Sequence, residues 1–355
     1  MSITFTSGTT SRPKGVPHSA FNLLENSRVF NKHMDFDSKS RFYHILPMSY
    51  MAGFLNLLLC PFVAGGSVVL TRAFDPLAIL TFWKDAMKHD ANTFWMTPTI
   101  LATLLRVDRN LDAPIYCQNK VRTVCVGTAA LPQKTKRDFE EKYTKELMES
   151  YGLSELLFIT ANTPRNKRMG GSVGRLLEGI NIKFMRDDGE EVTGGKEGEI
   201  WIQTPFKMMG YLDEKTNNPS DTDPYDWFPT GDVGCRDSEG NIFITGRKKD
   251  LIIHGGMNVS PKAVEETILH HQSVEQVAVV GIPNDFFGEE VVAAIKLKPG
   301  FEFSIEIETI RELCKRMLNP DSIPSKYFEV ESFPVTVNGK VKKNILREKF
   351  AQIKQ

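Results

Sequence analysis

A stretch of ten residues near the start of the chain concentrates the residue types that bind phosphate. It reads Thr6-Ser7-Gly8-Thr9-Thr10-Ser11-Arg12-Pro13-Lys14-Gly15 and directly follows the apolar run Ile3–Phe5. Glycines expose backbone N–H groups, hydroxyls donate hydrogen bonds, and Lys14 adds a positive charge. The stretch therefore predicts a loop that wraps the phosphates of a nucleotide.

Two other interpretations of this stretch are weaker. A flexible Ser/Thr-rich linker would not follow a strand so closely or contain the rigid Pro13. A P-loop phosphotransferase requires Gly-Lys-Ser/Thr, whereas Lys14 is preceded by proline and followed by glycine. ADP rather than AMP as the product would favour that second alternative.

Alternating strand-like and helix-like runs surround this loop. Strands are expected over Tyr43–Leu46, Val68–Leu70, Thr93–Met96 and Val121–Val126, and helices over Phe21–Phe30, Met51–Val63 and Asp75–Lys88. Strands that alternate with helices of this length indicate parallel βαβ layers. The fold class is therefore α/β in the large N-terminal part.

After about Gly170 the pattern changes to short strands separated by glycine turns. Ile180–Phe184, Glu199–Gln203 and Asn241–Ile244 predict a small β-rich subdomain, about residues 171–248. From Asp250 onward the runs predict a compact α+β domain. Its expected strands are 251–253, 276–280 and 291–297, and its expected helices begin at the Ser260-Pro261 cap, near Ile305 and after Lys343. The predicted division is thus 1–248 and 249–355.

Composition limits the classes of function. Lys plus Arg and Asp plus Glu both number 44, so no overall field favours nucleic acid or anionic lipid. The five cysteines are scattered without metal-ligand spacing, which predicts reduced thiols in the cytoplasm. No segment is long and apolar enough to predict a membrane span.

At this point the chain resembles a known family. The phosphate-binding stretch is similar to the signature of the adenylate-forming superfamily, with Ser11 where the family usually has glycine. Four further segments resemble its motifs in the family's order: Tyr151-Gly152-Leu153-Ser154-Glu155, Thr230-Gly231-Asp232, Gly246–Asp250 with Gly255-Gly256, and Asn338-Gly339-Lys340. This resemblance covers essentially the whole chain. It implies an acyl-CoA synthetase-like ligase that uses ATP, Mg²⁺ and coenzyme A.

The resemblance implies how the nucleotide is bound. Tyr151 offers an aromatic face for adenine, worth about 1–3 kcal/mol by analogy with base stacking. Ser154 and Glu155 are implied for the α-phosphate and Mg²⁺, respectively. Asp232, backed by Arg247, is implied for the ribose hydroxyls. Each residue alone has an ordinary structural alternative, such as a core aromatic, a helix-start carboxylate, a turn residue or a surface ion pair.

The resemblance singles out Lys340 for catalysis. A cation that bridges the carboxylate and the α-phosphate stabilises the charge that develops during attack. Its neighbours Lys342, Lys343 and Arg347 are expected to be merely solvated. Lys249 matches the hinge about which the C-terminal domain rotates between two reaction poses. Gly255 and Gly256 match the approach of the pantetheine arm, although a plain β-turn explains them nearly as well.

The substrate is only partly specified. Leu46–Gly53 resembles a segment in which synthetases carry histidine where this chain has Tyr50, and Gly127-Thr128-Ala129 resembles the wall of the acyl pocket. No acidic residue lies between Arg41 and Arg72 to pair an amino-acid ammonium. An uncharged pocket suits a fatty, short-chain or aryl acid. The thiol acceptor is coenzyme A or a carrier-protein pantetheine arm.

Only Met1–Phe5 precede the phosphate-binding stretch, whereas family members carry a sizeable segment there. A second hypothesis is therefore a nucleotide-binding fragment that is inactive without a complementing N-terminal polypeptide or self-association.

Overall fold

The computed structural model describes residues 1–6, 13–71, 76–166, 168–213, 216, 218–219, 223, 225–335 and 341–353. The chain divides into two compact units. The first comprises Met1–Thr230 with Cys235–Phe243, and the second comprises Gly231–Gly234 with Ile244–Gln355. The mobility of the C-terminal part and its boundary at residue 249 stay predictions.

A seven-stranded sheet forms the centre of the first unit, in the order β4-β3-β5-β6-β7-β8-β9. Strands β4, β3, β5, β6 and β7 run parallel to one another. Strand β8 is antiparallel to both of its neighbours, β7 and β9. The strands are β3 Arg41–His44, β4 Ser67–Leu70, β5 Thr93–Met96, β6 Thr123–Val126, β7 Leu147–Leu153, β8 Leu157–Ala161 and β9 Arg175–Leu176. The predicted α/β class is confirmed.

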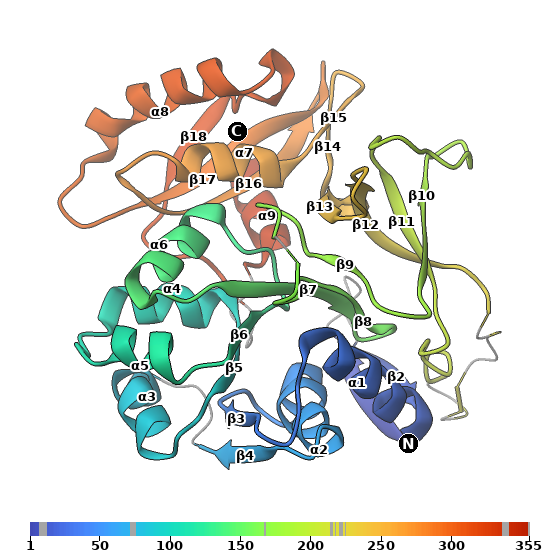
Figure 1. The fold of residues 1–355 in the computed structure, drawn as a ribbon. Coiled ribbons are helices and arrows are strands. Elements are labelled where there is room, and N and C mark those ends of the chain that lie inside the picture. The colour runs from blue at the N-terminus through green and yellow to red at the C-terminus, as the bar shows by residue number, and fades with distance from the viewer. Residues whose placement is uncertain are drawn as a thin grey trace. The chain divides into compact units, whose positions relative to one another are not determined.

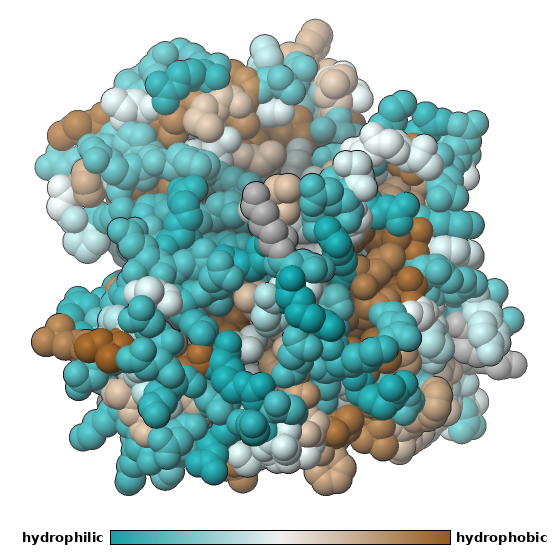
Figure 2. Space-filling view, viewed as in Figure 1, coloured by the Kyte–Doolittle hydropathy of each residue, from teal (hydrophilic) through white to brown (hydrophobic). Residues whose placement is uncertain are grey.

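Helices cover both faces of this sheet (Figure 1). On one face lie α3 Pro76–Lys88, α4 Pro98–Val107, α5 Ala113–Asn119 and α6 Gln133–Tyr143. On the other lie α1 Ala20–Met34, the π-helix η1 Ala52–Leu59 and α2 Cys60–Val63. Figure 2 shows hydrophilic side chains over α6, whose buried face contains Lys136, Phe139 and Tyr143.

The two residues at the centre of β5 show how the core forms on both faces. Side chains alternate along a strand, so Phe94 and Trp95 point in opposite directions. Phe94 lies beside Trp83 of α3, with ring centroids 5.3 Å apart. Trp95 lies beside Phe30 of α1 at 5.5 Å, and Phe30 stacks on Phe158 of β8. This four-residue strand therefore anchors helices to both faces of the sheet.

Two local predictions need correction. The strand expected over Tyr43–Leu46 begins and ends two residues earlier, at Arg41 and His44. The helix expected over Met51–Val63 exists, but its first part is a π-helix and Pro61 lies in the first turn of the short α2 that follows.

Strands β1 Ser2–Thr6 and β2 Lys14–His18 form a separate antiparallel hairpin, with Thr6 opposite Lys14. The predicted phosphate-binding stretch connects these strands. Its end was predicted wrongly, because Lys14 and Gly15 belong to β2 and pair with Thr6 and Phe5 rather than continuing the loop.

The small β-rich part is a four-stranded sheet in the order β10-β11-β12-β13. Its strands are β10 Asn181–Met185, β11 Gly198–Gln203, β12 Phe228–Arg236 and β13 Ile242–Arg247. The predicted strands at 180–184, 199–203 and 241–244 are confirmed within one to three residues at their ends. The division between the units passes through β12 and β13.

The second unit is a compact α+β fold, as predicted. Its sheet has the order β15-β14-β17-β16, with β18 parallel to β17. The elements are β14 Ile252–His254, β15 Met257–Val259, β16 Val274–Asn284, β17 Gly288–Leu297, β18 Lys326–Glu329, α7 Pro261–Leu269, α8 Phe303–Met317, α9 Lys343–Gln352 and the 3₁₀ turns η2 Lys248–Asp250 and η3 Pro320–Ser322.

Alternation along β16 gives this sheet two apolar faces. Val277 and Val279 pack in one core with α7 and α8, whereas Ala278 and Val280 pack in another with α9. The predicted cap is also present, because the Ser260 side chain accepts a hydrogen bond from the Ala263 N–H.

All five cysteines are free, and four of them are buried. Burial raises the pKa of Cys60 and of Cys117 to about 12, so these thiols stay protonated and unreactive. Among the described residues, no helix has the length and apolar character needed to cross a membrane.

Candidate active site

The Tyr151–Glu155 motif forms the end of β7 and the turn that leads into β8. Tyr151 pairs with Thr160 and is half-buried, and the register shifts between Tyr151 and Gly152. A Cβ at Gly152 would overlap the carbonyl oxygen of Leu157, so only glycine fits there. Ser154 and Glu155 follow in the turn, which excludes the alternative of Glu155 as a helix-start carboxylate.

Glu155 and Lys14 both contact one residue that the sequence analysis missed, Tyr211. The Tyr211 hydroxyl donates a hydrogen bond to Glu155 Oε1 at 2.9 Å. The Lys14 ammonium lies 4.7 Å from the centroid of the Tyr211 ring. Burial and the nearby Glu155 carboxylate raise the pKa of Tyr211, which keeps its hydroxyl a donor. The structure thus brings the predicted metal ligand and the predicted phosphate cation to the same aromatic ring.

Backbone hydrogen bonds hold these elements together. Met209 N donates to Pro17 O and Leu212 N to Gly15 O, each at 3.0 Å, so the segment 207–212 runs along β2. Met208 N donates to Glu155 O at 2.8 Å. This segment therefore joins the β1–β2 hairpin to the turn that carries Glu155.

His18 adds a further link between the same elements. Its Nε2 donates to the carbonyl oxygen of Ser154 at 2.7 Å. The ring is fully buried, and burial lowers the pKa of His18, so the imidazole is neutral near pH 7. The position of the Ser154 backbone is thus set from β2.

The Glu155 carboxylate is the kind of ligand that fits a magnesium ion arriving with a nucleotide. Mg²⁺ takes one or two protein carboxylates and completes its shell with water and phosphate oxygens. Glu155 supplies one half-buried carboxylate of this kind. In the described part of the chain, no group of three or more His, Cys, Asp or Glu side chains could hold a metal by itself. The site therefore fits a metal carried by its substrate.

The residues predicted for the acyl pocket lie partly together. Thr128 lies close to the Tyr50 side chain, and burial raises the pKa of Tyr50. Thr128 has a φ of 75°, a left-handed conformation that is strained for a β-branched residue. It lies between buried Gly127 and exposed Ala129. A Cβ at Gly127 would come within 2.9 Å of Ser150 Oγ, so a larger residue here would displace the Ser150 side chain.

Asp232 and Arg247 meet within the second unit. Arg247 Nε donates to Asp232 Oδ1 at 2.7 Å. Asp232 lies in β12 rather than in a turn, and its side chain is 4% exposed, whereas that of Arg247 is 46% exposed. A buried carboxylate with a charge-assisted partner is well suited to accept hydrogen bonds from a ribose.

The remaining predicted residues of the second unit lie nearby in sequence. Lys249 lies in η2, and partial desolvation of its ammonium lowers its pKa although much of the residue is exposed. Gly255 and Gly256 form the two-residue turn between β14 and β15, with φ values of 58° and 82°. Two positive φ values are the signature of a tight hairpin turn. The β-turn interpretation of these glycines is therefore correct, and a role towards pantetheine stays a prediction.

Several predicted site residues lie outside the described residues, namely Ser7, Gly8, Thr9, Thr10 and Lys340. Thr6 is the last residue of β1.

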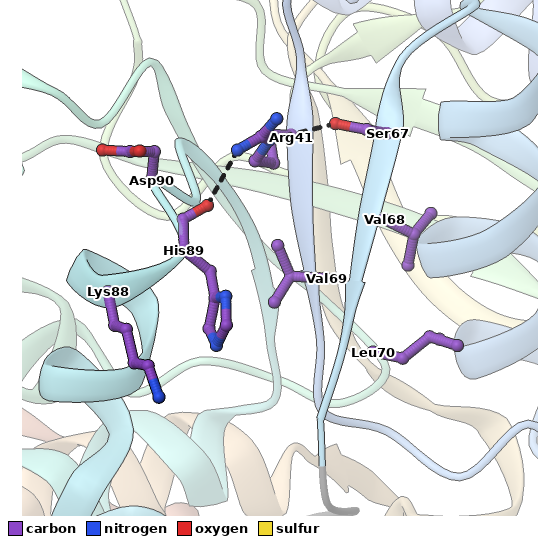
Figure 3. A pocket seen from close by; sticks show the side chains of 8 residues that line it. All are labelled: Arg41, Ser67, Val68, Val69, Leu70, Lys88, His89 and Asp90. Carbon is purple, nitrogen blue, oxygen red and sulfur yellow. Dashed lines mark hydrogen bonds between the residues drawn. The ribbon is translucent and has the colours of Figure 1, made fainter.

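A pocket of about 420 Å³ lies beside β4, at the edge of the large sheet (Figure 3). Arg41 lines it and donates to Ser67 Oγ at 3.2 Å and to the His89 carbonyl oxygen at 3.1 Å. The pocket shares no residue with the predicted site. We assign it no role in the chemistry.

Comparison with known proteins identifies similar sequences and folds. The family of AMP-binding enzymes matches residues 1–212, and the AMP-binding enzyme C-terminal domain matches residues 263–340. The chain is 32% identical to "Probable CoA ligase CCL9" of Humulus lupulus, over 98% of this chain and 66% of the relative. It is 31% identical to "Oxalate--CoA ligase" of Saccharomyces cerevisiae, over 99% of this chain and 63% of the relative. The chain thus spans about two thirds of the length of these curated relatives.

Solved structures show the same fold. ATP-bound MatB from Rhodopseudomonas palustris superposes with a TM-score of 0.88 at 30% identity, over 99% of this chain and 68% of that one.

Proposed function

The chain belongs to the family of AMP-binding enzymes, and from this premise we propose that it is an ATP-dependent acid–thiol ligase. A carboxylic acid and MgATP give an acyl-adenylate and pyrophosphate. A thiol then displaces AMP and forms a thioester.

One observation carries this proposal most directly. Lys14 and Glu155 lie far apart in the sequence, yet both contact Tyr211. The phosphates of a nucleotide need a cationic side chain, and a Mg²⁺ ion bound to them needs a hard oxygen ligand from the protein. A site for the complex of Mg²⁺ and nucleotide therefore needs both groups at short range. The contacts of Tyr211 supply both in one place.

Each residue has a role in the first step. Lys14 with Thr6, Ser7, Gly8, Thr9 and Thr10 binds the β- and γ-phosphates. Glu155 ligates the Mg²⁺ ion, which neutralises phosphate charge when bound. Tyr151 and Ser154 position adenine and the α-phosphate, and Asp232 with Arg247 binds the ribose. Lys340 stabilises the negative charge that develops between carboxylate and phosphorus.

The second step uses the C-terminal domain. Lys249 serves as the hinge about which this domain moves, and Gly255 with Gly256 admits the pantetheine arm. Coenzyme A is the proposed acceptor, because the relatives named above are CoA ligases. A phosphopantetheine arm on an acyl carrier protein is the alternative acceptor.

The substrate is proposed as a fatty, short-chain or aryl acid. Tyr50, Gly127, Thr128 and Ala129 form an uncharged set of side chains at the predicted acyl pocket. Small dicarboxylic acids also belong in any assay, because the yeast relative is named for oxalate. We place the enzyme in the cytoplasm, where its free cysteines stay reduced.

The deciding experiment measures release of AMP and pyrophosphate from MgATP. It uses the purified chain and a panel of monocarboxylic, aryl and dicarboxylic acids, with and without coenzyme A. Acid-dependent release of AMP supports the ligase and names the substrate class. ATP binding without release, rescued by a second polypeptide, would instead support the fragment hypothesis.

Lys340→Ala tests the catalytic assignment in the same assay. Loss of one charge-stabilising group should slow adenylate formation by about 10²–10³-fold while leaving ATP binding intact. Lys342→Ala is the matched control, since it removes a neighbouring lysine to which we assign no catalytic role. Near-normal adenylation by Lys340→Ala would refute the assignment.

A further inference from the structure

The segment 207–212 connects two parts of the proposed site, because its backbone bonds with both β2 and Glu155. It is attached to the rest of the first unit at a further point as well. The carbonyl oxygen of Lys207 accepts a hydrogen bond from Asn22 Nδ2 of α1 at 2.7 Å. Gly210 then adopts a φ of 102°, a conformation open to glycine, directly before Tyr211.

Tyr211 uses two different parts of its side chain. Its hydroxyl engages one oxygen of Glu155, and a carboxylate has a second oxygen with which to ligate a metal. Its ring face receives the Lys14 ammonium as a cation–π contact. The backbone supports this placement, because Leu212 N donates to Gly15 O beside Lys14.

These contacts matter because the charges of Lys14 and Glu155 are opposite. Two such side chains that are free to move towards each other form an ion pair. An ion pair between them would compete with phosphate for the ammonium and with metal for the carboxylate. Tyr211 is itself neutral, so its hydroxyl and its ring fix the positions of the carboxylate and the ammonium without adding an opposite charge to either.

We propose that Tyr211 is a positioning residue for MgATP, which holds Glu155 ready for the metal and Lys14 ready for the phosphates. The inference rests on the proposed function and adds to it a residue outside the five recognised motifs.

Two substitutions separate the two contacts. Tyr211→Phe removes the hydroxyl and keeps the ring under Lys14, whereas Tyr211→Leu removes both. Tyr225→Phe is the matched control, since Tyr225 is 72% exposed. For each protein, titration calorimetry gives the dissociation constant for ATP with excess Mg²⁺ and again with EDTA. Thermal unfolding gives the stability.

The expected pattern is specific to the metal. Tyr211→Phe should weaken binding of MgATP about tenfold, as expected for a lost hydrogen bond to a charged group, and change binding of metal-free ATP less than about twofold. Tyr211→Leu should weaken metal-free ATP as well, by about three- to fivefold. In the AMP-release assay, Tyr211→Phe should raise the Mg²⁺ concentration for half-maximal rate more than it lowers kcat.

Three results would overturn the inference. If Tyr211→Phe bound MgATP like the parent, the hydroxyl would have no positioning role, and the proposed ligase would stand without it. If Tyr211→Phe weakened ATP equally with Mg²⁺ and with EDTA, its effect would be general rather than on the metal ligand. If the parent itself failed to bind MgATP, the proposed function would fail and the inference with it. Tyr211→Phe preserves the ring, so the test holds even if Tyr211→Leu does not fold.

Discussion

Arg247 donates a hydrogen bond from Nε to a carboxylate that is almost fully buried, that of Asp232, at a distance of 2.7 Å. The guanidinium itself remains partly exposed. Burying a carboxylate is costly unless it is paired, so the hydrogen bond from Arg247 supports the burial of Asp232 at this point of β12.

This pair leads to a prediction about nucleotide binding. Asp232→Asn should weaken ATP binding about tenfold, because a ribose hydroxyl then loses a charged acceptor. Arg247→Lys should have a smaller effect, since it keeps the positive charge but loses the planar fork. Calorimetric titration with MgATP measures both. Unchanged affinity in Asp232→Asn would remove the ribose assignment.

The turn at Gly255-Gly256 should matter for the second step only. Alanine at either position must adopt a positive φ, which costs about 1–2 kcal/mol. We expect Gly256→Ala to slow thioester formation while leaving acid-dependent pyrophosphate exchange near normal. Gly240→Ala is the control for stability, because Gly240 has a similar φ of 88° in a turn to which we assign no function. Equal loss of both half-reactions in Gly256→Ala would contradict the role towards the thiol.

A buried ion pair joins α6 to β7, the strand that also carries Tyr151. Lys136 Nζ lies 2.6 Å from Glu149 Oε1, with side chains 7% and 8% exposed. Lys136→Met removes the ammonium from a buried carboxylate, and should lower the free energy of unfolding by about 3–5 kcal/mol. Denaturant unfolding monitored by circular dichroism measures this.

The exposed pair Lys134–Asp138 on the same helix provides the control for that prediction. Its separation is similar, at 2.7 Å, but its side chains are 36% and 43% exposed. Lys134→Ala should therefore change stability by about 0.5 kcal/mol or less. Similar losses in the two variants would show that burial does not decide the effect.

Stability should fall in mild acid. Burial lowers the pKa of His33 and of His44, so the folded state binds fewer protons than the unfolded state just below the ordinary histidine pKa of about 6.5. The stabilising contribution of the neutral rings is present above that value and is lost as the pH falls through the folded pKa values. The thermal midpoint should therefore decrease between about pH 7.5 and about pH 5.

His33→Gln tests the source of this dependence. Glutamine can still donate to the Ala161 carbonyl oxygen that His33 Nε2 contacts at 3.0 Å, but it does not titrate. The decrease in thermal midpoint should be smaller in His33→Gln and unchanged in His89→Gln, whose side chain is exposed. An equal decrease in His33→Gln and the parent would refute a role for His33.

Much of the local structure could be predicted from the sequence because its causes are local. The strand-like run Thr93–Met96 predicts a strand, and the strand is present, with Phe94 and Trp95 packing on opposite sides of the sheet because side chains alternate along it. The Ser260-Pro261 pair predicts a helix start, and Ser260 caps α7. The five motifs are sufficient to indicate the family, because they are linear patterns that can be recognised without knowledge of contacts.

Only the tertiary structure decided which of these residues meet. Tyr211 lies 56 residues from Glu155, and nothing in its local sequence indicates that its hydroxyl reaches that carboxylate. The same holds for His18 and Ser154, separated by 136 residues. Such contacts depend on how β2, the β7–β8 turn and the segment 207–212 are placed by the packing of the first unit. Local periodicity and capping specify elements, whereas the neighbours of a side chain follow from topology and core packing. The sequence alone therefore determined the family and the fold class, and the three-dimensional packing decided that Lys14 and Glu155 both contact Tyr211.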